Sequence, residues 1–152
     1  MAPLFAASVL LALLAGPALA RMRVDKLWLI TGAGQEKPVE IEVAEAPKEK
    51  ELGLMFRTQL ADNQGMLFPY DSPREITMWM RNTYIPLDMV FIRADGVVHR
   101  IERRAEPLSE RVISSQGPVS AVLEMAGGAT EKLGLKPGDR VRHPYFTGAR
   151  AP

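Results

Sequence analysis

Cysteine is absent from this chain of 152 residues, and histidine occurs only 2 times. The lack of thiols excludes a disulfide framework, a catalytic cysteine, an iron–sulfur cluster and a thiolate zinc site. A chain of this length fits a single domain and can bury a core without such cross-links. Its stability must therefore come from core packing and hydrogen bonding.

The chain also lacks an excess of either positive or negative charge. The chain has 19 basic and 18 acidic residues, which give a formal net charge of +1. No run of basic residues interleaved with aromatic ones is present, so we predict no binding to nucleic acid or to anionic lipid. Hydrophobic residues make up 47% of the chain and charged residues 24%, and these values are ordinary for a globular protein.

The first 20 residues contain no charged side chain. An apolar run from Leu4 to Ala15 is followed by Gly16-Pro17 and by small residues up to Ala20. This order predicts a signal peptide cleaved after Ala20, and hence a periplasmic or secreted protein. Because no basic residue precedes the apolar run, retention as an anchor is the alternative. About 12 apolar residues are fewer than the ~20 of a spanning helix, and no transmembrane span is predicted in the mature chain.

Short apolar runs with period-two alternation predict a mainly β domain. The predicted strands cover residues 26–31, 39–44, 65–68, 76–80, 87–93, 97–103, 119–125 and 140–143. One short helix is predicted to begin at Pro47 and another to cover 129–133. This pattern indicates a single-domain antiparallel β-sandwich or partly closed barrel. We divide the chain into a signal peptide (1–20), an N-terminal strand and loop (21–38), a β core (39–143) and a flexible tail (144–152).

Five segments match a known set of motifs: GLMFR (53–57), GMLFP (65–69), WMRNTYIPLDMVFI (79–92), DG (95–96) and VLEMAGGATEKLGLKPGDRV (122–141). They resemble domain of unknown function 192, an uncharacterised bacterial and archaeal family, over residues 39–142. Pro69 stands where that family tends to have valine. The resemblance implies a compact, mainly β domain that is often exported, and it implies no activity.

Asp88 is the polar residue that fits its predicted strand least. Residues 87, 89 and 91 share one face of the strand, and residues 88, 90 and 92 share the other, yet both faces are otherwise apolar. We therefore predict that Asp88 is buried and partnered, because an unpaired buried charge costs several kcal/mol. A two-residue turn at Asp95-Gly96 would place Asp88 opposite Arg103. An ion pair with Arg103 or hydrogen bonds to the backbone of 82–83 are the expected partners, and a role in a site is the alternative.

Six residues of these motifs have the chemistry of a binding pocket: Arg57, Trp79, Asn82, Thr83, Asp88 and Glu124. An aromatic face, amide and hydroxyl groups, a guanidinium and two acids suit a small polar ligand, a glycan fragment or a protein loop. Each also has a structural explanation, since Asn82 and Thr83 can hold a turn and Glu124 can cap the following helix. If Asp88 and Glu124 lay about 5–9 Å apart, they could serve as the acid and base of a glycosidase-type hydrolase.

Other polar or sulfur-bearing residues favour ordinary structure. In the predicted register His99 lies about 13 Å along the sheet from Asp88, so a Ser-His-Asp triad is not predicted. Methionine thioethers can bind Cu(I), but the apolar neighbours of these methionines favour core packing. The segment 62–65 is too short for a calcium loop. We predict neither a metal nor a cofactor.

The sequence thus predicts an exported cell-envelope domain whose favoured role is that of a non-enzymatic binding or accessory module. Its partner would be a small polar ligand, a glycan or an envelope protein. A hydrolase that uses Asp88 and Glu124 is the alternative from a different class, and a cluster that serves only the fold is the third. Trp79 exposed beside a cleft would favour binding, whereas a buried Trp79 would favour a structural cluster.

Overall fold

The computed structural model describes residues 21–146. The predicted signal peptide and residues 147–152 of the predicted tail lie outside the described residues. Within the described range no helix is both long enough and apolar enough to span a membrane. Residues 144–146, which were assigned to the tail, pack on the domain, and Phe146 is buried in the core.

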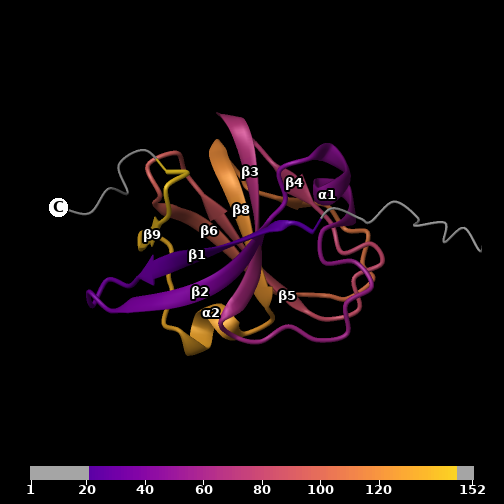
Figure 1. Cartoon of the computed structure of the whole chain (residues 1–152), viewed down its shortest axis with the longest axis horizontal. Coiled ribbons are helices and arrows are strands. Elements are labelled where there is room, and N and C mark those ends of the chain that lie inside the picture. The colour runs from indigo at the N-terminus through magenta and orange to yellow at the C-terminus, as the bar shows by residue number, and fades with distance from the viewer. Residues whose placement is uncertain (1–20, 147–152) are drawn as a thin grey trace, which may run out of the picture.

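One curled sheet of seven strands dominates the structure (Figure 1). Its strand order is β6-β5-β8-β3-β2-β1-β9. The bounds are Arg23–Ile30 (β1), Glu36–Val43 (β2), Gln64–Arg74 (β3), Leu87–Ile92 (β5), Val98–Ala105 (β6), Val119–Ala126 (β8) and Arg140–Arg142 (β9). The short strands β4 (Thr77–Met78) and β7 (Ile113–Ser114) form a second sheet, and the helices are α1 (Pro47–Leu52) and α2 (Ala129–Lys132). The mainly β prediction is confirmed, in the form of a partly closed barrel.

The two edges of the sheet meet at one end of the molecule. A bridge joins Val97 to Arg140, so the start of β6 lies beside β9. The Val98 amide donates to the Asp139 carbonyl at 2.8 Å, and the Val141 amide donates to the Gly96 carbonyl at 2.7 Å. These bonds satisfy backbone groups that an open edge would expose, and they close the barrel on this side.

The pairing of β2 with β3 is parallel, whereas the other strand pairs are antiparallel. A parallel pair needs a crossover between its strands. Here the crossover consists of α1 and the loop from 53 to 63. The crossover brings α1 onto the outer face of the sheet, beside the small β4–β7 sheet (Figure 1).

Apolar side chains form two clusters, one on each face of the curled sheet. The cluster inside the barrel includes Leu27, Ile41, Val90 and Leu123, whereas the outer cluster includes Phe68, Met80, Met89, Phe91 and Val122. Strands β5 and β8 contribute to both clusters and are buried along nearly their whole length. The apolar character of both faces of 87–92 therefore did predict a central strand.

The turn after β5 contains three residues, not the predicted two. The Arg93 amide donates to the Val97 carbonyl, and the Gly96 amide donates to the Arg93 carbonyl, both at 2.9 Å. Gly96 has φ of 79°, as a three-residue hairpin loop requires at its last position. A register shift between Phe91 and Ile92 then restores the predicted pairing. Phe91 lies opposite Arg100, and Met89 lies opposite Glu102.

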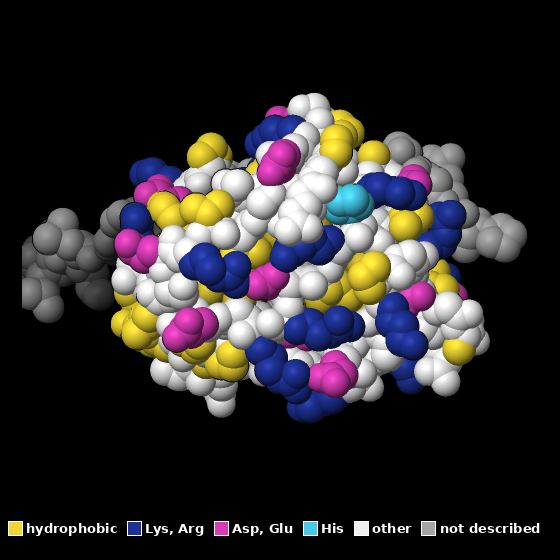
Figure 2. All heavy atoms as spheres, turned by 180° about the vertical axis from the view of Figure 1, so that it is seen from behind, with side chains coloured by type: hydrophobic (Ala, Val, Ile, Leu, Met, Phe, Trp, Pro, Cys, Tyr) yellow, Lys and Arg dark blue, Asp and Glu magenta, His cyan; other side chains and the backbone are white. Residues whose placement is uncertain are grey.

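Charged side chains on the surface pair with each other. Glu102 accepts from Arg100 and from Arg111, and Arg104 donates to Glu131 at 2.9 Å. Figure 2 shows acidic side chains lying among the basic ones on the back of the molecule. This face therefore carries no field of a single sign, in keeping with the near-neutral net charge.

Candidate functional site

Asp88 is fully buried and has four hydrogen-bond donors. The backbone amides of Arg104 and Gly128 donate to its Oδ1 at 2.8 and 2.9 Å. The amide and the hydroxyl of Thr130 donate to its Oδ2 at 3.0 and 2.6 Å. The carboxylate thus links strand β5 to β6 and to the start of α2, and it serves the fold.

The predicted partners of Asp88 were wrong. Arg103 donates its guanidinium to the Leu135 carbonyl at 2.9 Å, and the turn at 82–83 makes no hydrogen bond to Asp88. A second register shift, between residues 87 and 89, is the reason. It turns the Arg104 amide toward the carboxylate, with Arg104 at φ of 48°, so a backbone donor replaces the expected side chain.

Glu124 lies on the other face of the sheet. It pairs with Met89 of β5, whereas Asp88 pairs with Met125. Paired residues point to the same side of a sheet and successive residues point to opposite sides. The structure therefore does not bring the two carboxyls to one cleft, and a hydrolase that needs both of them on one bond finds no support in this geometry. Glu124 does not cap α2 either, because Asp88 accepts from that helix.

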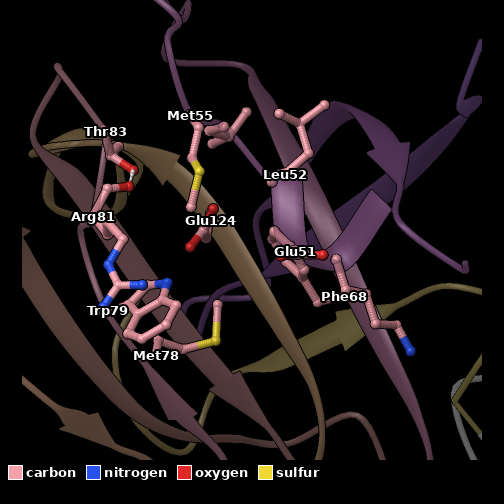
Figure 3. A pocket seen from close by; sticks show the side chains of 12 residues that line it. Glu51, Leu52, Met55, Phe68, Met78, Trp79, Arg81, Thr83 and Glu124 are labelled. Atoms are coloured by element: carbon pink, nitrogen blue, oxygen red, sulfur yellow. Dashed lines mark hydrogen bonds between the residues drawn. The ribbon is translucent and has the colours of Figure 1, made fainter. Parts of the chain in front are cut away.

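A narrow slot opens above Glu124 on the outer face of the sheet. Its volume is about 40 Å³, and it lies between the crossover segment and the β4–β5 connection. Its lining residues are Lys50, Glu51, Leu52, Gly53, Leu54, Met55, Phe68, Met78, Trp79, Arg81, Thr83 and Glu124. Figure 3 shows the Glu124 carboxyl between Met55, Phe68 and Trp79, pointing into the slot. A larger groove of about 370 Å³ adjoins it and shares Lys50, Glu51, Met78 and Trp79.

The Glu124 carboxyl has no protein partner among the described residues. It is only 4% exposed, and neither a hydrogen bond nor an ion pair links it to any residue of 21–146. Burial raises its pKa to about 8 from an ordinary 4.5, and no neighbouring cation offsets this effect. At neutral pH the Glu124 carboxyl is therefore protonated, and it can both donate and accept a hydrogen bond. A cation that entered the slot would ionise it.

Trp79 stands at the mouth of the slot and is 45% exposed. One face of its ring is covered by Arg81, whose guanidinium carbon lies 4.0 Å from the ring centroid. Arg81 also donates to Glu110 at 2.8 Å. The arginine therefore holds the indole in place while its charge is paired with Glu110. Figure 3 shows the Arg81 guanidinium against the Trp79 ring.

Thr83 and Asn82 belong to the turn that supports one wall of the slot. The Thr83 hydroxyl donates to the Arg81 carbonyl at 3.1 Å, which fixes the turn. Thr83 lines the slot, whereas Asn82 does not. Asn82 has φ of 52°, and its amide nitrogen lies 4.0 Å from the Met55 sulfur. Asn82 thus supports the site through the turn and does not reach into the slot.

Arg57 belongs to a different part of the surface. Its guanidinium pairs with Glu42 of β2 at 2.5 Å, and it lines a separate hollow of about 200 Å³ beside β2. Of the six predicted site residues, the slot therefore collects Trp79, Thr83 and Glu124. Asn82 lies behind the slot, and Asp88 and Arg57 lie elsewhere.

The residues that sequence reasoning missed come from the crossover. Lys50, Glu51 and Met55 line the slot opposite Trp79. The charges of α1 suggested only a solvated helix face, and Met55 suggested core. Their position follows from the parallel pairing of β2 with β3, and no local sequence pattern predicts that pairing. The available signal was the motif segment GLMFR (53–57), which contains Met55.

Residues 21–146 contain no cluster of three or more His, Asp or Glu side chains arranged to hold a metal ion. The ligand atoms that the slot offers are the carboxyls of Glu51 and Glu124, the Thr83 hydroxyl and the thioethers of Met55 and Met78. This arrangement can hold a polar or cationic group at its floor and an apolar stem along its walls.

A family model described as "Uncharacterized ACR" and named DUF192 matches residues 29–143. The chain belongs to the DUF192 family. The match covers every residue of the slot as well as Asp88, so both buried acids lie inside the family domain. No curated protein matches the chain.

Two solved structures are similar to this chain over most of its length. A protein from Sinorhizobium meliloti 1021, described as a "putative transcription regulator", is 42% identical, with a TM-score of 0.80. The similarity covers 82% of this chain and 97% of that one. A protein of unknown function from Novosphingobium aromaticivorans DSM 12444 is 37% identical, with a TM-score of 0.78, over 91% of this chain and 100% of that one.

Proposed function

We propose that this DUF192 protein is a non-enzymatic binding module of the cell envelope, and that the slot above Glu124 receives a polar group of its ligand. One observation carries the proposal. Glu124 is buried at the floor of an open slot, and it has no hydrogen-bond or ion-pair partner among the described residues. A buried acid that the fold does not use costs stability, and such groups mark functional sites.

Binding is favoured over the predicted hydrolase because the two acids of that hydrolase, Asp88 and Glu124, do not share the slot. General acid–base chemistry needs a second group within reach of the same bond, and Asp88 lies on the opposite face of the sheet. The half-exposed Trp79 beside the slot is the feature that a binding pocket was expected to have. A volume of about 40 Å³ suits the tip of a ligand, while the adjoining groove can take the remainder.

We do not extend the role of transcription regulator to this chain. DNA-binding domains carry a basic footprint that neutralises phosphates. Here the net charge is +1, and the arginines of β6 are engaged with acids or with a backbone carbonyl. Location in the envelope is supported by the signal-peptide pattern of the first 20 residues.

A ligand screen tests the binding role. Small amines, amides, carboxylic acids and monosaccharides would be titrated into ¹⁵N-labelled protein, with amide shifts read around Thr83 and Glu124. At least one class should shift these amides, and Glu124→Gln should weaken its binding by tenfold or more. The matched control is Glu45→Gln, an exposed acid outside the slot and the groove, which should retain binding. If no class shifts these amides, the slot is not a binding site.

Cell fractionation tests the location. The full chain expressed in a bacterium should be recovered from the periplasm or the medium, shortened by 20 residues in intact-mass analysis. Recovery of the full-length chain from the cytoplasm would contradict export. Recovery of the full-length chain from the membrane fraction would support the anchor alternative.

A further inference from the structure

We propose that the occupant of the slot is a lysine-type primary amine carried by an apolar segment of a partner protein. The inference rests on the proposed function and specifies its ligand. It joins two features of the same region. One is the uncompensated acid at the floor of the slot, and the other is a set of exposed apolar side chains, the apolar rim, on the segments that line the slot or are hydrogen-bonded to them. The apolar rim consists of Leu52, Phe56, Trp79, Tyr84 and Leu108, all of which are at least 45% exposed.

Two residues of the apolar rim have a backbone conformation that is unfavourable for residues with a side chain. Phe56 has φ of 64° and Leu108 has φ of 63°, which is the left-handed region that favours glycine and asparagine. Their side chains are 55% and 59% exposed, so core packing does not repay this strain. Backbone strain together with exposed apolar surface at one place is typical of an interaction site.

The turn at 82–83 fixes both strained residues relative to the slot. The Phe56 amide donates to the Asn82 carbonyl at 2.9 Å, and the Leu108 amide donates to the Thr83 carbonyl at 3.0 Å. The Phe56 ring also contacts the Tyr84 ring edge to face, with centroids 5.9 Å apart. Because Thr83 itself lines the slot, these two hydrogen bonds hold Phe56 and Leu108 next to the turn that forms one of its walls.

The chemistry of the slot matches an alkylammonium group. Its walls include the apolar side chains of Leu54, Met55, Phe68 and Met78, which suit a methylene stem. Its floor is a carboxyl that becomes an ion-pair partner once a cation arrives. The volume of about 40 Å³ suits the ammonium tip of such a chain.

The basic residues near the mouth do not fill this role. Arg81 lies on the Trp79 ring and donates to Glu110. Lys50 lies over the Tyr70 ring, with its Nζ 4.8 Å from the centroid. Neither makes an ion pair with Glu124, and neither lowers the pKa of that carboxyl. The cation that would complement Glu124 therefore has to come from outside residues 21–146.

Fluorescein-labelled heptapeptide pools test the proposal by polarisation. Each pool has serine at both ends, mixed leucine, valine and phenylalanine on either side of the centre, and lysine, norleucine or glutamate at the centre. The lysine pool should bind at least tenfold more tightly than the norleucine pool, and the glutamate pool should not bind. n-Butylammonium chloride, titrated into ¹⁵N-labelled protein, tests the amine without the apolar segment.

Four variants locate the effect. Glu124→Gln should reduce binding of the lysine pool to the norleucine level. Phe56→Asn and Leu108→Asn keep the left-handed backbone, remove the apolar side chain and should weaken the lysine pool at least fivefold. Val24→Ser, which removes an equally exposed apolar side chain on β1 outside the apolar rim, should leave binding unchanged.

Each contrary result has a distinct meaning. Equal binding of the lysine and norleucine pools overturns the amine. Binding of n-butylammonium with no gain from any peptide pool, and no effect of the Phe56 and Leu108 variants, overturns the partner segment and leaves the slot as a binding site. Binding of only an amide or a monosaccharide in the ligand screen overturns this inference alone. Binding of nothing at Glu124 overturns the proposed function as well.

Discussion

Asp88 and Glu124 are two buried acids on neighbouring strands, and their surroundings are opposite. Asp88 lies inside the barrel and accepts four hydrogen bonds from three residues. Glu124 lies on the outer face and accepts none from the described residues. One pair of strands thus carries an acid that the fold needs and an acid that the fold does not use.

This contrast shows that burial alone does not identify a site. Both residues lie in apolar strands and both are less than 5% exposed. The two residues differ in the hydrogen-bond donors around them. The backbone amides of Arg104 in β6 and of Gly128 before α2 donate to Asp88, whereas Glu124 faces thioethers, an indole and open space. The useful signal is therefore an almost buried polar side chain that has no protein partner and whose oxygens reach an open slot.

The largest effect should come from Asp88→Asn. The substitution keeps the shape, but it removes the charge and turns an NH₂ group toward amide donors. We expect a loss of about 3 kcal/mol in the free energy of unfolding, measured by urea denaturation at pH 7. Asp62→Asn, which breaks an exposed ion pair with Lys132, is the control and should cost less than about 1 kcal/mol. Equal losses in the two variants would contradict the role given to Asp88.

The next effect concerns pH. Between pH 4.5, the ordinary pKa of the carboxyl, and its folded pKa of about 8, the native state holds one proton more on Glu124 than the unfolded state does. Stability should therefore fall as pH rises through this window, by up to about 1.4 kcal/mol per unit, and level off above pH 8. The measurement is urea denaturation of the wild type and of Glu124→Gln from pH 5 to 9.

The difference between these two proteins isolates Glu124, and Glu124→Gln should show the shallower profile. The acids whose pKa is lowered by hydrogen bonds and cations, such as Asp25, Glu36 and Asp95, titrate below this window and act in both proteins. Parallel profiles for wild type and variant would mean that Glu124 is ionised and paired in the folded protein.

A smaller loss is expected from Thr130→Val. It removes the hydroxyl that donates to Asp88 at 2.6 Å and leaves the Thr130 amide in place. One lost bond to a charged group should cost about 1.5–3 kcal/mol, less than the loss of the carboxylate itself. In the background of Asp88→Asn the same change should cost much less, and this double-mutant cycle checks that the two residues act together. Additive losses would argue against a shared network.

The smallest effect should be a gain, from Leu108→Asn. Asparagine adopts the left-handed conformation at lower cost than leucine, and an exposed leucine contributes little packing. We expect the free energy of unfolding to rise by about 0.5–1 kcal/mol, measured as for the other variants. Leu52→Asn, at a helical and similarly exposed position, should lower it. A loss in Leu108→Asn would mean that the side chain serves the fold.

The sequence predicted the elements better than their partners. Period-two alternation located the strands of the main sheet, and Pro47 marked the start of α1. It also marked Asp88 as buried. It missed β7, which has only two residues and no apolar run, and it extended β4 to 76–80 because Ile76 and Met80 are buried without belonging to a strand.

The hydrogen-bond and packing partners of these residues could not be predicted because they depend on register shifts between strands and on the crossover between β2 and β3. Asp88 finds its donors through a register shift that no residue type requires, so the expected Arg103 pair did not form. Glu124 was expected to cap α2. Its side chain instead points to the opposite face of the sheet from Asp88, which accepts the hydrogen bond from Gly128 at the start of that helix. Arg57 shares a motif with Met55 and lies two residues away, yet only Met55 reaches the slot.

The parallel pairing of β2 with β3 has a kinetic consequence. The crossover that permits this pairing also supplies one wall of the slot, from Lys50 to Met55. Contacts distant in sequence form slowly because the intervening loop must close first. The slot brings Met55 of the crossover to Glu124 of β8, which lies far along the chain, so we expect the slot to form late in folding. A ligand held there would slow the rate of unfolding and leave the rate of folding unchanged.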